Sequence, residues 1–141
     1  MVIRRIIAED AEAVNALSRQ LGYPLSKEQT LKNINEVLGS NEHDAFVAVH
    51  ENKIAGWIGL AQAIMIELPP HCEINGLVVD ENYRGKGVGK LLIEKARQWA
   101  KEKGNSKMSL HCNVKREEAH LFYRHLGFSE IKKQTNFEII I

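Results

Sequence analysis

A basic, glycine-rich segment is the part of this sequence whose residue types and spacing indicate chemistry. It reads Arg84-Gly85-Lys86-Gly87-Val88-Gly89-Lys90 and follows the apolar run Cys72–Asp80. From Val88 onward, apolar residues recur at helical spacing, namely at Val88, Leu91, Leu92, Ala96, Trp99 and Ala100. A glycine-rich turn at the start of a helix exposes unpaired backbone N–H groups at the positive end of the helix dipole. The segment therefore predicts a phosphate-binding site.

Two common phosphate-binding motifs do not fit this segment. Placing the Gly-Lys pair of a Walker loop on Gly89-Lys90 puts Arg84 where the first glycine belongs and Leu91 where the hydroxyl residue belongs. The dinucleotide fingerprint G-x-G-x-x-G fails from Gly85 and from Gly87, because neither start leads to a third glycine. The spacing therefore disfavours both classes of nucleotide-binding loop.

The remaining pattern, Arg-Gly-x-Gly-x-Gly, resembles the pyrophosphate-binding loop of the GNAT N-acetyltransferase superfamily. Leu77-Val78-Val79 ahead of the loop resembles the family's fourth strand, and Ala119–Phe128 resembles its A-x-x-F-Y-x-x-x-G-F signature. The close resemblance covers Glu73–Phe128, and the N-terminal half agrees in general layout. The resemblance implies acetyl transfer from acetyl-CoA to an amine, by direct transfer in a ternary complex.

The same resemblance implies where acetyl-CoA binds. Its pantetheine arm would follow the fourth strand, and a backbone N–H of Val78 or Val79 would polarise the thioester carbonyl. That strand carries a bulge in the family, and Gly76 is the natural place for it here. The cofactor-binding residues that we expect are Leu77, Val78, Val79, Arg84, Gly85, Lys86, Gly87, Val88, Gly89, Lys90, Asn113 and Tyr123.

Two residues are candidates for proton transfer. The family signature implies that Tyr123 protonates the departing thiolate, since a phenol with a pKa near 10 stays protonated at neutral pH. Glu73 is the candidate general base, because strand alternation places it on one face with Asn75, Leu77 and Val79. A structural or substrate-binding role for Glu73 and a water chain in place of a base stay open, and His71 and His111 are weaker candidates.

One position departs from the family pattern. Many members place an asparagine that contacts the cofactor arm at the start of the fourth helix, where this chain has Arg116. The nearest asparagine is Asn113, which could contact the arm or cap the helix. Both readings stay open.

The elements that must position these residues follow from periodicity and turn residues. We expect strands over residues 2–7, 45–50, 54–67, 73–79, 107–112, 128–132 and 137–141, with Pro69-Pro70 breaking the chain before the fourth. Helices should begin at Glu9, after a capping Ser26, near Val88 and at Glu117. The expected fold is α/β (α+β), a GNAT-like mixed, mostly antiparallel twisted sheet of about seven strands with four flanking helices, splayed between strands four and five.

Length and composition favour a single domain over residues 1–141. The start of the chain has no apolar signal region, and the stretch Ile54–Leu68 falls short of the ~20 residues needed to span a bilayer. We therefore expect a cytoplasmic protein without membrane partners. Cys72 and Cys112 fit reduced thiols in strands, and no histidine spacing indicates a metal site.

Charge is distributed unevenly along the chain. Residues 1–75 carry 6 basic and 10 acidic side chains, whereas residues 76–141 carry 13 and 8. Either ordinary surface variation explains this, or a basic half meets a polyanionic cofactor and an acidic half meets a small cationic amine. A nucleic-acid partner is not indicated. Two alternatives stay open: a peptide N-terminus or lysine as acceptor, and a non-catalytic acyl-CoA-binding or sensing module. The family resemblance also implies a homodimer.

Overall fold

A computed structural model describes residues 1–141 as two compact units, Met1–Leu110 and His111–Ile141. The elements of the first unit are β1 (Val2–Arg5), η1 (Ala8–Asp10), α1 (Ala11–Gln20), α2 (Lys27–Leu38), β2 (His43–His50), β3 (Lys53–Met65), β4 (Leu68–Val79), η2 (Glu81–Tyr83), α3 (Val88–Glu102) and β5 (Met108–Leu110). The second unit contains α4 (Glu117–His125). That residues 1–141 form a single domain stays a prediction.

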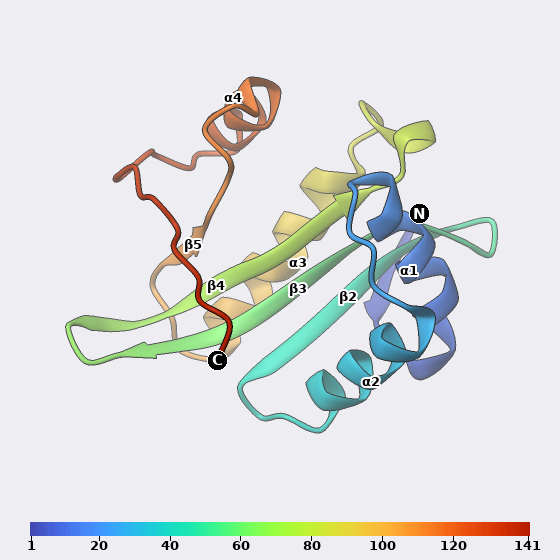
Figure 1. Cartoon of the computed structure of the whole chain (residues 1–141). Coiled ribbons are helices and arrows are strands. Elements are labelled where there is room, and N and C mark those ends of the chain that lie inside the picture. The colour runs from blue at the N-terminus through green and yellow to red at the C-terminus, as the bar shows by residue number, and fades with distance from the viewer. The chain divides into compact units, whose positions relative to one another are not determined.

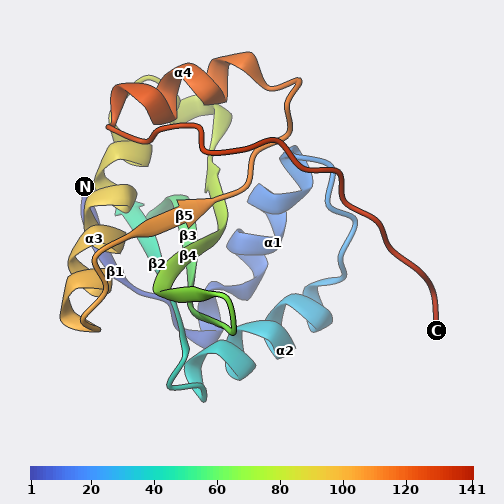
Figure 2. The ribbon, with the colours of Figure 1, turned by 90° about the vertical axis from the view of Figure 1, so that its left-hand side faces the viewer.

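The first unit is built on one sheet of five strands in the order β1-β2-β3-β4-β5. The first four strands pair antiparallel with their neighbours, and β5 runs parallel to β4. Helix α3 covers one face of this sheet, and α1 and α2 cover the other (Figures 1 and 2). The mixed sheet and the four helices confirm the predicted α/β fold class.

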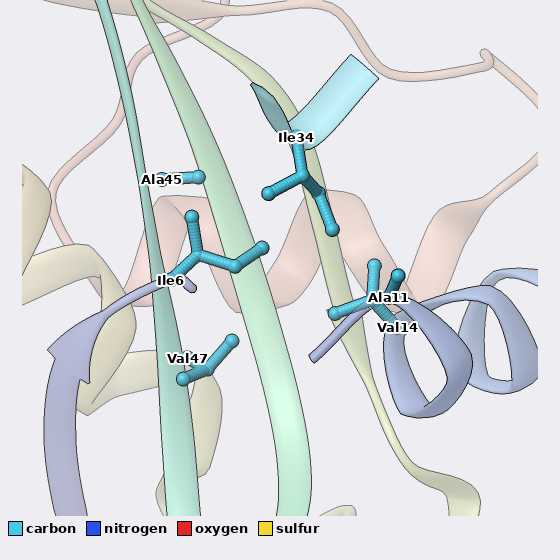
Figure 3. Close-up of a cluster of buried hydrophobic side chains, with 6 residues drawn as sticks. All are labelled: Ile6, Ala11, Val14, Ile34, Ala45 and Val47. Atoms are coloured by element: carbon cyan, nitrogen blue, oxygen red, sulfur yellow. The ribbon is translucent and has the colours of Figure 1, made fainter. Parts of the chain in front are cut away.

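Apolar side chains fill the space between the sheet and the α1–α2 face. The cluster consists of Ile6, Ala11, Val14, Ile34, Ala45 and Val47 (Figure 3), and the partly buried Trp57 packs against it. On the opposite face, Leu92, Ile93 and Ala96 of α3 are fully buried. Because burying one large aliphatic side chain is worth roughly 1.5–3 kcal/mol, these two layers hold the sheet between them.

The helices follow their sequence signals with two exceptions. The helix expected from Glu9 begins at Ala11, because Ala8–Asp10 form the short 3-10 helix η1. The hydroxyl of Ser26 accepts a hydrogen bond from the backbone N–H of Gln29 at 3.1 Å, which confirms the predicted cap of α2. On α3, Leu91 is 43% exposed although its spacing predicts burial, and Ile93 takes the buried position. None of the helices has the length and apolar character that a membrane crossing requires.

Strand predictions at two places are wrong. The structure has five strands rather than about seven, because residues 128–141 form neither strand nor helix. Alternating apolar residues such as Phe137 and Ile139 favour a strand locally, but a strand needs a hydrogen-bonding neighbour, and the second unit contains no sheet. The expected break at Pro69-Pro70 is also absent, since β4 starts at Leu68 and tolerates both prolines in its first residues.

Candidate functional site

The glycine loop connects the end of β4 to the start of α3. Gly85 and Gly87 have φ angles of 77° and 82°, in the left-handed region that favours glycine, and Gly87 is the residue from which α3 begins. A β-carbon at either position would meet nothing within 4 Å, so backbone conformation rather than space requires glycine here. The first-turn N–H groups of α3 have no acceptor inside the helix, which leaves them to bind an anion.

Three cations surround this helix start. Arg84, Lys86 and Lys90 are exposed, whereas Val88 and Gly89 between them are buried and fix the first turn of α3 against the sheet. The ammonium of Lys86 lies 5.5 Å from the centroid of the Tyr83 ring. Backbone N–H groups, the helix dipole and flexible basic side chains together form a site for a phosphorylated ligand.

Strand β4 carries a bulge immediately before its last residues. Gly59 pairs with Gly76 and Leu60 pairs with Ile74, so Asn75 is the extra residue. The bulge was predicted at Gly76 and lies one residue earlier, at Asn75. Gly76 itself is required by packing, because a β-carbon there would lie 2.6 Å from the Trp57 ring.

The bulge also opens one edge of the strand. Pairing between β4 and β5 runs from Cys72 to Ile74 and ends there, opposite Leu110. Beyond the bulge, Leu77–Val79 has β3 as its partner on the other side and no strand on the β5 side. This edge can offer backbone N–H and C=O groups to an extended ligand.

The bulge changes the faces of the candidate residues. Leu77 pairs with Ile58, on the face that packs against α3, whereas Glu73 pairs with Ala61 on the opposite face. The expectation that Glu73 shares a face with Leu77 and Val79 is wrong, because one inserted residue inverts the alternation. Glu73 is half-buried and faces the α1–α2 side together with Val78.

Tyr123 lies on α4 in the second unit. The half-buried positions of this helix include Ala119, Phe122, Tyr123 and Leu126, as its spacing predicts. The Tyr123 ring contacts those of Phe122 and Phe128, with centroids 5.3 and 5.8 Å apart. Burial raises the pKa of Tyr123, nearby Cys112 raises it further, and Arg116 lowers it. A protonated phenol in this setting can donate to a departing anion.

Asn113 does not cap α4. Arg116 is the residue at the helix start, and it makes no side-chain capping bond. The side-chain oxygen of Asn113 accepts from the backbone N–H of Lys115 at 2.9 Å, and its carbonyl lies 2.9 Å from Nε2 of His120. Asn113 therefore shapes the turn before α4.

Both cysteines are free thiols, as expected, but Cys112 lies outside the predicted strand, because β5 ends at Leu110. Cys72 is fully buried, and burial, with a smaller effect of Glu73, raises the pKa of its thiol to about 11. Such a thiol is protonated at neutral pH and is a poor nucleophile. No group of His, Cys, Asp and Glu side chains is arranged to hold a metal ion.

The first unit thus brings together the glycine loop, the bulged strand and Glu73, and the second brings together Tyr123, Asn113 and Arg116. Sequence reasoning missed His50 and Tyr83, whose side chains meet beside the glycine loop at 3.2 Å. The position of Tyr83 directly before Arg84 was the only available signal, because His50 lies far away in the sequence.

The chain matches the acetyltransferase (GNAT) family over residues 10–128. An uncharacterised N-acetyltransferase of Chlorobaculum tepidum is 29% identical over 134 residues, which are 94% of this chain and 77% of the relative. Another from Methanocaldococcus jannaschii is 40% identical over 65 residues, 46% of this chain but only 29% of its own length.

A solved structure resembles the fold over nearly its whole length. It is AAC(6′)-Iy in complex with a bisubstrate analogue, CoA-S-monomethyl-acetylneamine. The TM-score is 0.87 at 20% sequence identity, with 99% of this chain and 98% of that chain covered. At this identity the likeness concerns the fold.

Proposed function

The chain belongs to the GNAT acetyltransferase family, and from that premise we propose that it moves an acetyl group from acetyl-CoA to a primary amine of a small molecule. The observation that carries the proposal is the glycine loop, where Gly85 and Gly87 adopt positive φ angles at the start of α3. The pyrophosphate of acetyl-CoA would bind the N–H groups of this turn. Arg84, Lys86 and Lys90 would add charge-assisted contacts.

The bulged strand supports a place for the pantetheine arm. The backbone edge of Leu77–Val79 has no strand partner on the β5 side, so its polar groups suit the amides of an extended arm. In the proposed complex the N–H of Val78 or Val79 donates to the thioester carbonyl and stabilises the oxyanion that forms on it. Asn113 or Arg116 would contact the arm from the start of α4.

Direct transfer then needs three proton movements. An alkyl amine with a pKa near 10.4 is almost wholly protonated at neutral pH, so Glu73, directly or through water, would accept its proton. The amine nitrogen attacks the carbonyl carbon, the C–N bond forms and the C–S bond breaks. Tyr123 gives its proton to the departing CoA thiolate, and the second proton that the nitrogen loses on becoming an amide returns through solvent to the Tyr123 phenolate. The buried thiol of Cys72 is a poor nucleophile, and the proposed direct transfer forms no acyl-enzyme.

The acceptor class rests on charge and on the fold neighbour. Residues 1–75 carry 6 basic and 10 acidic side chains, a balance that suits a cationic amine. The neighbour AAC(6′)-Iy, an aminoglycoside N-acetyltransferase, was solved with the bisubstrate analogue CoA-S-monomethyl-acetylneamine. We therefore place small polyamines and aminoglycosides first among acceptors, ahead of a peptide N-terminus or lysine.

Ligand-dependent thermal unfolding tests the cofactor. Acetyl-CoA or CoA at a hundredfold excess over Kd should stabilise the fold by about 2.7 kcal/mol, whereas ATP and NADH should not. Gly87→Glu, which adds a negative charge at the helix start, should remove the shift. If neither acetyl-CoA nor CoA shifts the thermal unfolding of the wild-type protein, the proposal is contradicted. Binding to CoA without thiol release from acetyl-CoA across an amine panel would indicate a non-catalytic binding module instead.

We also propose that the protein is a cytoplasmic homodimer. The support for self-association is an exposed apolar end of the chain, in which Phe137, Ile139 and Ile140 are 92%, 85% and 96% exposed. Exposed apolar groups of this kind favour association with a partner surface. Sedimentation at working concentration should show a dimer that dissociates when residues 137–141 are removed. A monomer throughout would contradict it.

A further inference from the structure

Tyr83 anchors the turn that leads into the glycine loop. From Glu81 to Gly87 every residue is exposed except Tyr83, which is half-buried. Its hydroxyl lies 3.2 Å from Nδ1 of His50, and the two rings meet edge to face with centroids 5.6 Å apart. The side chain of Tyr83 is therefore one of two contacts that hold this exposed stretch to the body of the unit; the other is the hydrogen bond that the backbone N–H of Glu81 donates to the side-chain oxygen of Gln20 at 3.2 Å.

His50 belongs to the end of the β2–β3 hairpin. It is the last residue of β2, and Glu51 and Asn52 after it form the tight turn with φ angles of 50° and 64°. A second bond joins the same hairpin to the loop, because the N–H of Asp80 donates to the carbonyl of Ala55 at 2.8 Å. Two attachments from one hairpin thus fix where the chain leaves β4.

Tyr83 also holds a cation of the loop. The ammonium of Lys86 lies 5.5 Å from the centroid of the Tyr83 ring, and the backbone N–H of Lys86 donates to the carbonyl of Tyr83 at 3.3 Å. Restraining Tyr83 therefore restrains Lys86, in the segment where Gly85 and Gly87 provide the most backbone freedom.

We propose that His50 is a positioning residue for the cofactor: through Tyr83 it holds the glycine loop in its anion-binding conformation. The inference rests on the proposed function, in which this loop binds the pyrophosphate of CoA. A ligand that binds a pre-organised loop loses less conformational entropy, so the His50–Tyr83 contact increases affinity without touching the ligand. His50 acts before chemistry, and its removal raises the KM for acetyl-CoA while kcat at saturation stays unchanged.

Calorimetric titration of CoA tests this with four proteins: wild type, His50→Ala, Tyr83→Phe and the double variant. Tyr83→Phe removes only the hydroxyl and keeps the ring beneath Lys86. The loss of one hydrogen bond should raise Kd about three- to tenfold in each single variant. The Kd of the double variant for CoA should be no higher than that of the single variant with the higher Kd, because both substitutions remove the same contact. Additive losses would overturn the inference.

Two further variants separate positioning from general destabilisation. His50→Asn places an amide near the position of Nδ1 and should recover most of the affinity. His43 is the matched control, since it starts the same strand and its Nδ1 lies 2.9 Å from the hydroxyl of Ser40. His43→Ala should leave the Kd for CoA unchanged. If the wild type binds CoA and the His50 and Tyr83 variants bind equally well, the inference fails alone; if the wild type does not bind CoA, the proposed function fails with it.

Discussion

The indole ring of Trp57 occupies the space in which a side chain at Gly76 would lie. A β-carbon at residue 76 would come within 2.6 Å of one ring atom and 2.7 Å of another. Trp57 is itself packed against the buried cluster between the sheet and the α1–α2 face. The ring thus joins the core to the residue that directly follows the bulge at Asn75.

We expect Gly76→Ala to lower the free energy of unfolding by about 1–3 kcal/mol, because the rigid ring has to move within a packed core. Chemical denaturation measures this. In a Trp57→Leu background the added cost of Gly76→Ala should be smaller, since the obstructing ring is gone. Gly39→Ala is the control: its nearest neighbour would be an ordinary contact at 3.5 Å, and its stability should change by less than about 0.5 kcal/mol. Equal costs in both backgrounds would contradict the steric explanation.

Substitutions of the glycines at the two ends of α3 distinguish the cost of backbone strain from an effect on ligand binding. Gly87 and Gly104 have φ angles of 82° and 83°, and a β-carbon at either would meet nothing within 4 Å. Gly87→Ala and Gly104→Ala should therefore cost similar stability, about 1–2 kcal/mol each. Only Gly87→Ala should also lower the affinity for CoA, because only Gly87 lies at the start of the helix. Titration of both variants checks this, and equal loss of CoA affinity would argue against the loop as the site.

Local signals predicted the parts of the fold that local chemistry determines. The Ser26 cap and the apolar face of α4 depend on residues within one or two helical turns, and both are present in the structure. The glycines of the loop were recognisable because positive φ angles favour glycine whatever lies around them. These interactions need no knowledge of the rest of the chain.

The errors concern interactions that depend on a partner. Strand alternation placed Glu73 with Leu77, but the inserted Asn75 inverts the faces, and the register against β3 decides where it is inserted. Apolar alternation around Ile139 favours a strand that has no neighbour to pair with. The contact between His50 and Tyr83 follows from where a hairpin ends, which no nearby residue signals.

Cys72 should make stability depend on alkaline pH. Burial raises the pKa of its thiol from an ordinary value of 9.0 to about 11. Between these values the unfolded chain has lost the proton and the folded protein retains it, so the free energy of unfolding falls as pH rises. Two pKa units correspond to at most about 2.7 kcal/mol, reached above pH 11 and absent below pH 9.

Denaturation at pH 8 to 11 of wild type, Cys72→Ala and Cys112→Ala measures this contribution. Lysines and tyrosines also titrate in this range, so the difference between variants is the quantity of interest. The decline should be shallower in Cys72→Ala, which lacks the buried thiol, than in Cys112→Ala, which keeps it. Parallel profiles for wild type and Cys72→Ala would show that the thiol does not contribute.

Glu73→Gln tests the proposed base. The amide has nearly the shape of the carboxylate but cannot accept the proton of an ammonium, so kcat/KM for the amine should fall about 10²-fold near neutral pH. The loss should shrink as pH approaches the pKa of the acceptor amine, because the substrate then arrives deprotonated. Rate profiles of both proteins from pH 6 to 10 measure this. A constant ratio across that range would assign Glu73 a structural or substrate-binding role.

Tyr123→Phe tests the proposed acid with little effect on folding, because the ring that contacts Phe122 and Phe128 remains. The Kd for CoA should stay near the wild-type value while kcat falls about 10²- to 10⁴-fold, since the thiolate then departs without a proton. Burial raises the pKa of Tyr123 above its ordinary value of 10.0, so wild-type kcat should persist past pH 10 before this acid is lost. Phe122→Leu, a change to the neighbouring ring that keeps the hydroxyl, should retain kcat. Full turnover by Tyr123→Phe would remove the phenol from the mechanism and leave water to protonate the thiolate.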